Sequence, residues 1–303
     1  MRTLKISDSV ISDKSKPFVI AEIGHNHQGD IELCKKMFLA AKNAGASGVK
    51  LQKRSNKNQF TKKAYHSSYN SENSYGKTYG EHREFLEFNE QQYLTLKEYA
   101  KEIGILFFST AFDFESVDFL KSVGMPAIKI ASGDIINLEL LSYASKTGIP
   151  LIVSTGSSCI DDVDQAVNVL NKGSSEFSLL QCTSGYPAKY EEINLKVIET
   201  MRTRYQNIVI GLSSHENGIS IPVAGYALGA RIIEKHFTID RTMKGTDQAF
   251  SLSSSGMTKL CRDLNRLYLA MGDGNKKVYE SEFEPMKKQR KSVVAKIPLK
   301  SGT

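Results

Sequence analysis

The chain has 303 residues, of which 40% are hydrophobic and 24% charged, and its formal net charge is +7. This length allows two average domains or one large α/β barrel, and the composition is ordinary for a globular protein. No apolar run is long enough for a transmembrane helix, the polar N-terminus does not resemble a secretory signal, and four cysteines do not suggest a disulfide framework. We therefore expect a cytoplasmic protein with reduced thiols.

Most of the positive charge lies near the C-terminus. Eight Lys or Arg and three Glu between residues 276 and 303 give a net charge of +5, so the preceding 275 residues carry only +2. A nucleic-acid-binding domain would be expected to carry a basic stripe on its folded body, and the periodic segments contain none. We therefore expect neither a nucleic-acid partner nor a membrane partner.

From residue 18 onward, short β-branched runs alternate with amphipathic helical stretches. The first strand is expected at 18–23, before a helix at 31–44. The second strand is expected at 47–52, before a polar insertion at 53–88 without a clear period and a helix at 91–102. The other strands are expected at 105–110, 126–131, 150–154, 177–182, 207–212 and 232–236. The other helices are expected at 115–122, 137–147, 160–171, 194–205, 219–229 and 256–270.

The number of elements decides between architectures. Eight strands alternating with eight helices over residues 18–270 favour a (β/α)8 TIM barrel, which needs about 250 residues. A doubly wound sheet usually has fewer strands and a Gly-rich first turn, whereas the first strand here ends in Glu22-Ile23-Gly24-His25. We predict an N-terminal extension at 1–17, a TIM-barrel domain at 18–272 and a linker from 273 onward.

Polar or ionisable residues follow nearly every predicted strand. In a (β/α)8 barrel the reactive groups lie at the C-terminal ends of the strands, on the loops that lead into the helices. A purely structural barrel would not need such a density of polar groups at one rim. The residues in question are Glu22, His25, Asn26, His27, Lys50, Gln52, Ser109, Thr110, Lys129, Ser132, Asp134, Ser154, Thr155, Gln181, Thr183, Ser184, Tyr186, Ser213, His215, Glu234 and His236.

Two lysines, Lys50 and Lys129, lie inside otherwise apolar strands. A buried lysine without a partner is costly, so each either pairs with a buried carboxylate, such as Glu22 or Glu234, or faces an anionic ligand. The second alternative is favoured because hydroxyl groups, which suit a phosphate or carboxylate, stand at nearby strand ends. These hydroxyl groups belong to Thr110, Ser132, Ser154 and Ser213.

Two histidines end consecutive strands, His215 on the seventh and His236 on the eighth. Neighbouring strands lie about 4.8 Å apart, so the two imidazoles could share one divalent metal or could only form hydrogen bonds at the rim. His25 and His27 are weaker candidates because the next helix begins just after them. Cys182 lies near these groups, but a nucleophilic role would need an activating base and a lowered pKa, and we do not favour it.

Eight motifs at eight successive strand ends, AEIGHNHQGD, GVKLQKR, STAFD, KIASGD, STG, LQCTSGYP, GLSSHE and EKHFT, resemble those of the sialic acid synthases. The resemblance covers residues 17–303. Residues 74–88 are most similar to the animal-type branch, which uses a phosphorylated sugar, whereas bacterial members use the free sugar. Ser184 stands where the bacterial enzymes have Asn, although animal-type members share CTS. The segment KSVVA at 291–295 resembles the start of the family's antifreeze-like domain, so we expect 273–303 to hold a linker and the start of that domain, truncated.

The resemblance implies a reaction of phosphoenolpyruvate with N-acetylmannosamine, or its 6-phosphate, and water. The products would be N-acetylneuraminate, or its 9-phosphate, and phosphate. The enzyme would be a homodimer with a divalent metal, typically Mn²⁺, with Mg²⁺ or Co²⁺ possible, that polarises the sugar aldehyde. Glu22 would be the acid/base that stabilises the cation at C2 and directs water, and Lys50 and Lys129 would act with it. The anionic groups of phosphoenolpyruvate would be held by Lys50, Thr110, Lys129, Ser132, Ser154, Ser184 and Ser213. The sugar would be held by Gln52, Asp134, Tyr186 and Asp247, and the metal by His215 and His236.

Other interpretations remain open. A legionaminate or pseudaminate synthase would perform the same chemistry on another hexose, and a metal-dependent aldolase or hydrolase could use the same barrel. A non-enzymatic binding or antifreeze-type protein is disfavoured because polar or ionisable residues follow nearly every predicted strand. The choice between free sugar and 6-phosphate is also open, because a basic stretch could meet a sugar phosphate or form a solvated loop face. This stretch consists of Lys53, Arg54, Lys57, Lys62 and Lys63.

Overall fold

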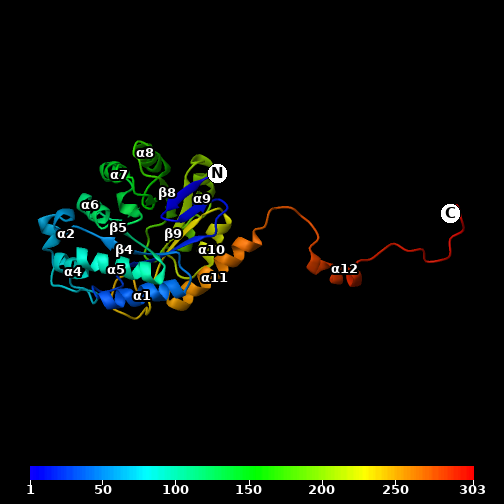
Figure 1. Cartoon of the computed structure of the whole chain (residues 1–303), viewed down its shortest axis with the longest axis horizontal. Helices are drawn as coiled ribbons and strands as arrows, with labels where there is room; N and C mark the ends of the chain where they lie inside the picture. The colour runs from blue at the N-terminus through cyan, green and yellow to red at the C-terminus, as the bar shows by residue number, and fades with distance from the viewer. The chain divides into compact units, whose positions relative to one another are not determined.

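The computed structural model describes residues 1–303 and divides into two compact units, Met1–Leu269 and Ala270–Thr303. The first unit holds a closed barrel of eight parallel strands in chain order, with the last strand beside the first (Figure 1). The predicted (β/α)8 barrel is therefore confirmed. The barrel strands are β3 (Phe18–Gly24), β4 (Gly48–Lys53), β5 (Leu106–Ala111), β6 (Ile128–Ile130), β7 (Leu151–Ser154), β8 (Phe177–Cys182), β9 (Val209–Ser214) and β10 (Ile232–His236).

Eight helices pack around the outside of the strands (Figure 1). Their ends carry the expected signals: Asp30 caps the first helix, and a capping box at Asn89 and Gln92 begins the second, which ends at Gly104 with a φ of 70°. Each helix buries an apolar face against the strands in one large core. The helices are α1 (Ile31–Asn43), α5 (Glu90–Ile103), α6 (Phe114–Ser122), α7 (Leu138–Ser145), α8 (Ile160–Leu170), α9 (Val197–Arg204), α10 (Ser220–Ala227) and α11 (Ser254–Ala270).

The polar insertion between β4 and α5 contains three short helices. They are α2 (Asn56–Gln59), α3 (Lys62–Tyr65) and α4 (Tyr79–Leu86). Helices of four residues complete little more than one turn, so they leave no periodic hydrophobic pattern in the sequence. The longest, α4, begins at a capping box formed by Thr78 and Glu81. This arrangement brings residues of α4 toward the rim of the barrel.

A hairpin of β1 (Thr3–Ile6) and β2 (Ser9–Ser12) precedes the barrel and was not expected from the polar start of the chain. Its apolar side chains pack into the barrel's inner core with residues from the N-terminal ends of the strands. The hairpin thus closes that end of the interior and leaves the opposite end for the site. The buried members of this inner core are Leu4, Ile6, Ile11, Phe18, Ile20, Phe108, Ala127, Ile152, Leu180, Val209 and Ile232.

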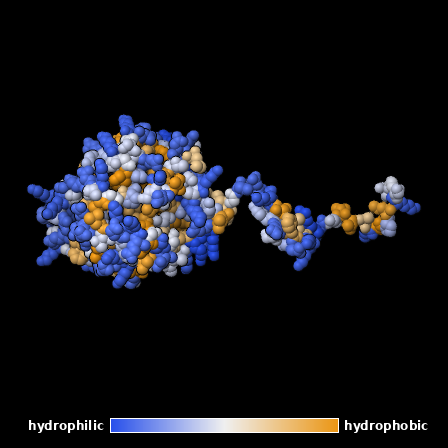
Figure 2. Space-filling model, viewed as in Figure 1, coloured by the Kyte–Doolittle hydropathy of each residue, from blue (hydrophilic) through white to orange (hydrophobic).

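The outer surface of the first unit shows hydrophobic residues scattered among hydrophilic ones (Figure 2). No helix of the chain is long and apolar enough to cross a membrane. The second unit contains a 3₁₀ turn, η3 (Glu280–Glu282), and a short helix, α12 (Phe283–Gln289), neither with a buried residue. Its last segment exposes four apolar side chains, at Val293, Val294, Ile297 and Leu299.

Candidate active site

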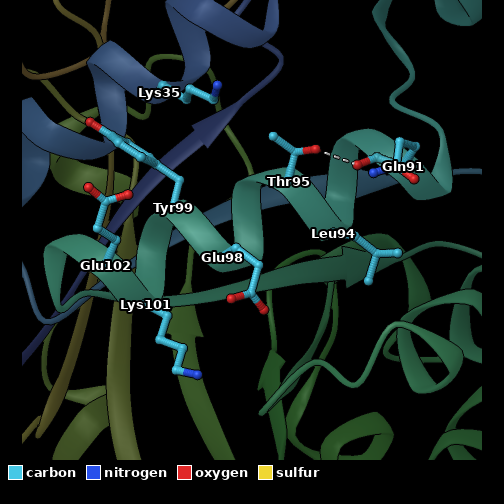
Figure 3. A pocket seen from close by; sticks show the side chains of 8 residues that line it. All are labelled: Lys35, Gln91, Leu94, Thr95, Glu98, Tyr99, Lys101 and Glu102. Carbon is cyan, nitrogen blue, oxygen red and sulfur yellow. Dashed lines mark hydrogen bonds between the residues drawn. The ribbon is translucent and has the colours of Figure 1, made fainter.

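A cavity of about 410 Å³ opens at the C-terminal ends of the barrel strands, and all eight strands contribute to its lining. This volume lies within the range of about 300–1,000 Å³ that is usual for small-molecule sites. A larger hollow, of about 750 Å³, runs along the outer surface of α5. Its side chains are exposed or half-buried and do not converge on one point (Figure 3). We therefore place the chemistry at the rim of the barrel.

The register of the strands brings the charged residues together. Glu22 on β3 stands beside Lys50 on β4 and beside His236 on β10, and Lys129 on β6 stands beside Thr110 on β5. Side chains on a strand alternate between its two faces, so this register places these five side chains together inside the barrel. We call this set of side chains the lysine layer. The layer lies directly above the apolar inner core.

Lys50 forms an ion pair and faces the cavity at the same time. Its Nζ lies 2.5 Å from Glu22 Oε2 and donates to Thr110 Oγ1 at 2.8 Å. Gln52 Nε2 donates to the other oxygen of Glu22, Oε1, at 2.7 Å. The two alternatives left open by the sequence, a carboxylate partner and a ligand-facing lysine, are therefore compatible at this position.

Lys129 has a similar environment on the other side of the layer. Its Nζ donates to Ser154 Oγ at 2.7 Å and lies 3.9 Å from Glu234 Oε1. Burial lowers the pKa of Lys129, although Glu234 opposes the shift. Burial alone would raise the pKa of Glu234, but the charges of Lys129 and Lys50 outweigh it and hold that pKa below its usual value. Ser213 Oγ also donates to Glu234, at 3.0 Å.

Gly156, just after β7, lies close to two hydroxyl groups and one thiol. Gly156 N donates to Ser132 Oγ at 3.0 Å. A Cβ at Gly156 would lie 2.2 Å from Ser184 Oγ and 2.7 Å from Ser132 Oγ, so any side chain there would displace these hydroxyl groups. Cys182 accepts a bond from Ser132 at 3.3 Å, and burial raises the pKa of its thiol. The serines therefore supply a compact set of donors, and the thiol stays protonated.

The two rim histidines lie side by side, with ring centroids 5.3 Å apart. Burial and the neighbouring His236 lower the pKa of His215 to about 3, and its Nδ1 lies 3.3 Å from the carbonyl oxygen of Thr183. His236 Nδ1 is buried without a hydrogen-bond partner, and Asp247 Oδ2 lies 3.6 Å from it. No group of three His, Cys, Asp or Glu ligands is assembled in the chain. The pair fits a cation that takes two imidazole nitrogens and completes its shell from water or substrate.

Three of the four residues expected to hold the sugar line the cavity, and the fourth does not. Gln52, Tyr186 and Asp247 line the cavity, and the Tyr186 ring lies 4.4 Å from that of His215. Asp134 is not among the lining residues; it accepts a bond from Asn137 at 3.4 Å, and burial raises its pKa. The other predicted site residues line the cavity, namely Glu22, Lys50, Thr110, Lys129, Ser132, Ser154, Ser184, Ser213, His215 and His236.

One side of the cavity is lined by His25, Arg54, Arg83 and Phe112, of which the strand-end pattern singles out only His25. Arg83 lies on α4, inside the insertion without a period, so no strand-end rule could find it. His27, two residues after His25, is instead buried against Phe88, with ring centroids 4.2 Å apart. The two neighbouring histidines therefore have different surroundings.

The fold and the cavity define a (β/α)8 barrel whose rim carries cationic and hydroxyl groups, and known proteins share the barrel fold. Residues 37–276 match the NeuB family model. N-acetylneuraminate-9-phosphate synthase of Mus musculus is 41% identical over 97% of this chain and 82% of its own length. N,N'-diacetyllegionaminic acid synthase of Campylobacter jejuni is 38% identical over 95% of this chain and 87% of its own length. The crystal structure of a sialic acid synthetase from Leptospira borgpetersenii superposes with a TM-score of 0.80 at 34% identity, over 95% of this chain and 96% of that one.

The chain therefore belongs to the NeuB family. The predicted resemblance to the sialic acid synthases is confirmed, as is the prediction of an enzyme of that class. The legionaminate and pseudaminate alternatives are less favoured, because the N-acetylneuraminate-9-phosphate synthases share more of the sequence.

Proposed function

We propose that this enzyme joins phosphoenolpyruvate to N-acetylmannosamine, or to its 6-phosphate, and forms N-acetylneuraminate, or its 9-phosphate, with release of phosphate. One observation carries the proposal: a single cavity holds two buried lysines bonded to hydroxyl groups and, in the same lining, two adjacent imidazoles. The name of the mouse relative, a synthase of N-acetylneuraminate 9-phosphate, supports the same reaction.

In this proposal the lysine layer binds phosphoenolpyruvate. Lys50 and Lys129 offer ammonium donors, and Thr110 and Ser154 are already within hydrogen-bond distance of them. Ser132, Ser184 and Ser213 add hydroxyl groups around the same space. Charge-assisted bonds to phosphate and carboxylate oxygens are short and strong, so this set suits a small molecule that carries both groups.

The sugar would lie between the imidazoles and the outer rim, in contact with Gln52, Tyr186 and Asp247. His215 and His236 would hold a divalent metal, for which we propose Mn²⁺, with Mg²⁺ or Co²⁺ as substitutes. When bound there, the metal would supply Lewis-acid polarisation of the sugar's aldehyde oxygen.

Glu22 is the acid/base in this proposal. C3 of phosphoenolpyruvate attacks the aldehyde carbon, the aldehyde oxygen takes up a proton, and positive charge develops at C2. Water adds to C2, and the tetrahedral intermediate then breaks its C2–O bond and releases phosphate. The Glu22 carboxylate is held by Lys50 and Gln52 at the cavity surface, where it can stabilise the charge at C2 and accept a proton from the water.

The test is phosphate release that requires phosphoenolpyruvate and Mn²⁺, measured with N-acetylmannosamine and with its 6-phosphate. We expect release with at least one of these sugars and a nonulosonic acid product of matching mass. Release only with another N-acetylated hexose would favour the legionaminate or pseudaminate alternative. Absence of phosphoenolpyruvate-dependent release with every sugar would refute the proposed reaction.

We also propose that the enzyme acts in the cytoplasm as a homodimer. The cytoplasmic location is supported by four free cysteines, which are typical of a reducing compartment. The homodimer rests on the family resemblance alone, and light scattering of the purified chain tests it by mass.

A further inference from the structure

Two arginines converge on one imidazole in the wall of the cavity. Arg54 follows β4 and Arg83 lies on α4, and both line the cavity together with His25. Arg54 Nη1 lies 3.5 Å from His25 Nε2, and Arg83 Nη1 lies 3.4 Å from His25 Nδ1. The insertion between β4 and α5 therefore brings a second pair of positive charges into the site.

Neither of these guanidinium groups has a carboxylate partner. Glu87, the acid beside them, binds Lys53 Nζ at 2.9 Å and lies 3.8 Å from His25 Nε2. No carboxylate oxygen lies within 4.0 Å of either guanidinium. This pair differs from Lys50 and Lys129, whose charges Glu22 and Glu234 balance. Both arginines are partly buried, and a cation withdrawn from water without a counter-ion is costly unless a ligand supplies the negative charge.

His25 cannot replace the missing partner. Burial, reinforced by Arg54, His27 and Arg83, lowers its pKa well below the usual value, so the ring is neutral. A neutral imidazole has a single acceptor nitrogen, and it can therefore satisfy only one of the two arginines. Arg54 has no other hydrogen bond from its guanidinium, so most of its donors remain free.

The two guanidinium groups are nevertheless fixed in place. The guanidinium of Arg54 stacks on the Phe112 ring, 3.6 Å from its centroid. Arg83 donates from Nε and Nη2 to the Tyr79 hydroxyl at 3.0 and 2.8 Å. Such preorganised planar forks match the oxygens of a phosphate group.

We propose that Arg54 and Arg83 bind the phosphate of a phosphorylated acceptor sugar, so that this enzyme prefers N-acetylmannosamine 6-phosphate to the free sugar. The inference rests on the proposed function. The lysine layer already accounts for the anions of phosphoenolpyruvate, and the uncharged free sugar would leave the arginine pair uncompensated. Of the basic stretch considered in the sequence, only Arg54 lines the cavity; Lys53 pairs with Glu87, while Lys57, Lys62 and Lys63 are exposed.

The experiment compares kcat/KM for the two sugars at saturating phosphoenolpyruvate and Mn²⁺. We expect the wild-type enzyme to prefer the 6-phosphate by at least about 10-fold, the effect of one charge-assisted interaction. Arg54→Gln and Arg83→Gln should each reduce this preference roughly 10- to 100-fold. The matched control, Lys57→Gln, removes an exposed positive charge from the same insertion and should keep the wild-type preference.

Equal kcat/KM values for both sugars in the wild-type enzyme would overturn the inference. An arginine variant that lowers kcat/KM equally for both sugars would overturn it as well. A rise in KM for phosphoenolpyruvate in Arg54→Gln and Arg83→Gln, as large as the loss of sugar preference, would assign the two arginines to phosphoenolpyruvate and would also overturn the inference. Should a Gln variant unfold, Arg54→Lys and Arg83→Lys keep the charge but lose the planar fork, and a smaller loss of preference is expected. If the wild-type enzyme releases no phosphate, the proposed function fails, and calorimetric binding of N-acetylmannosamine 6-phosphate, compared with the free sugar, still decides the inference.

Discussion

Glu22 and Lys50 face each other across neighbouring strands, with Lys50 Nζ 2.5 Å from Glu22 Oε2 and both side chains almost wholly buried. The pair lies at the boundary between the apolar inner core and the open cavity. Because Gln52 holds the second oxygen of Glu22, the carboxylate has one fixed orientation. The anion binding proposed for Lys50 and the proton transfer proposed for Glu22 would therefore take place at adjacent groups.

Replacing this carboxylate separates the two roles. We expect Glu22→Gln to lower kcat by about 10²–10⁴-fold, the usual contribution of a general acid or base. Phosphoenolpyruvate should still bind, because Lys50 and Thr110 remain in place. Phosphate release measures the first effect and calorimetry the second. Full activity in Glu22→Gln would remove this residue from the mechanism, and Glu32→Gln, on the exposed face of α1, is the control.

The metal assignment depends on the two rim imidazoles. His215→Ala removes one of the two nitrogen ligands, so we expect the affinity for Mn²⁺ to fall at least about 10-fold, since loss even of a residue that only supports a ligand costs 10- to 100-fold. Titration followed by electron paramagnetic resonance of free Mn²⁺ measures this directly. His66→Ala, an exposed histidine of the insertion, should bind Mn²⁺ as the wild-type protein does. Unchanged Mn²⁺ binding by His215→Ala would show that the assignment is wrong.

The close approach of Gly156 to two serines gives a third prediction. In Gly156→Ala the new methyl group would meet Ser184 Oγ and Ser132 Oγ, and both hydroxyl groups would have to move. We expect KM for phosphoenolpyruvate to rise about 10-fold, with a loss of about 1–3 kcal/mol in the free energy of unfolding from overpacking. Steady-state kinetics and urea denaturation measure the two effects. A normal KM would mean that these serines do not touch the substrate.

Much of the fold can be read from the sequence because all eight barrel strands are largely buried and most are rich in β-branched residues. The β1–β2 hairpin escaped detection because its four-residue strands bury only a few apolar side chains, among them Leu4, Ile6 and Ile11. The rule that reactive groups follow parallel strands also located most of the cavity lining, including Lys50 and His236.

The rest of the site depends on distances that a sequence does not contain. Arg83 reaches the cavity from a helix in the insertion, and nothing in its local pattern separates it from a solvent-facing arginine. The pairing of β3 with β4 shifts register between Glu22 and Gly24, at the end of β3, where Gly24 has a φ of 54°. That local geometry places His25 in the cavity wall, while His27 packs against Phe88.

The burial of His27 should make the stability of the barrel depend on pH. Burial lowers its pKa from 6.5 to about 3, so the unfolded chain binds one more proton between these values. The free energy of unfolding should therefore fall as the pH falls, by up to about 2 kcal/mol from this residue between pH 7 and pH 5. In His27→Asn the side-chain oxygen can still accept the bond from Gly29 N, but the group no longer titrates. Urea denaturation at both pH values should thus show a smaller loss of stability in the variant than in the wild-type protein. An equal loss in both proteins would mean that His27 is as easily protonated in the folded state as in the unfolded one.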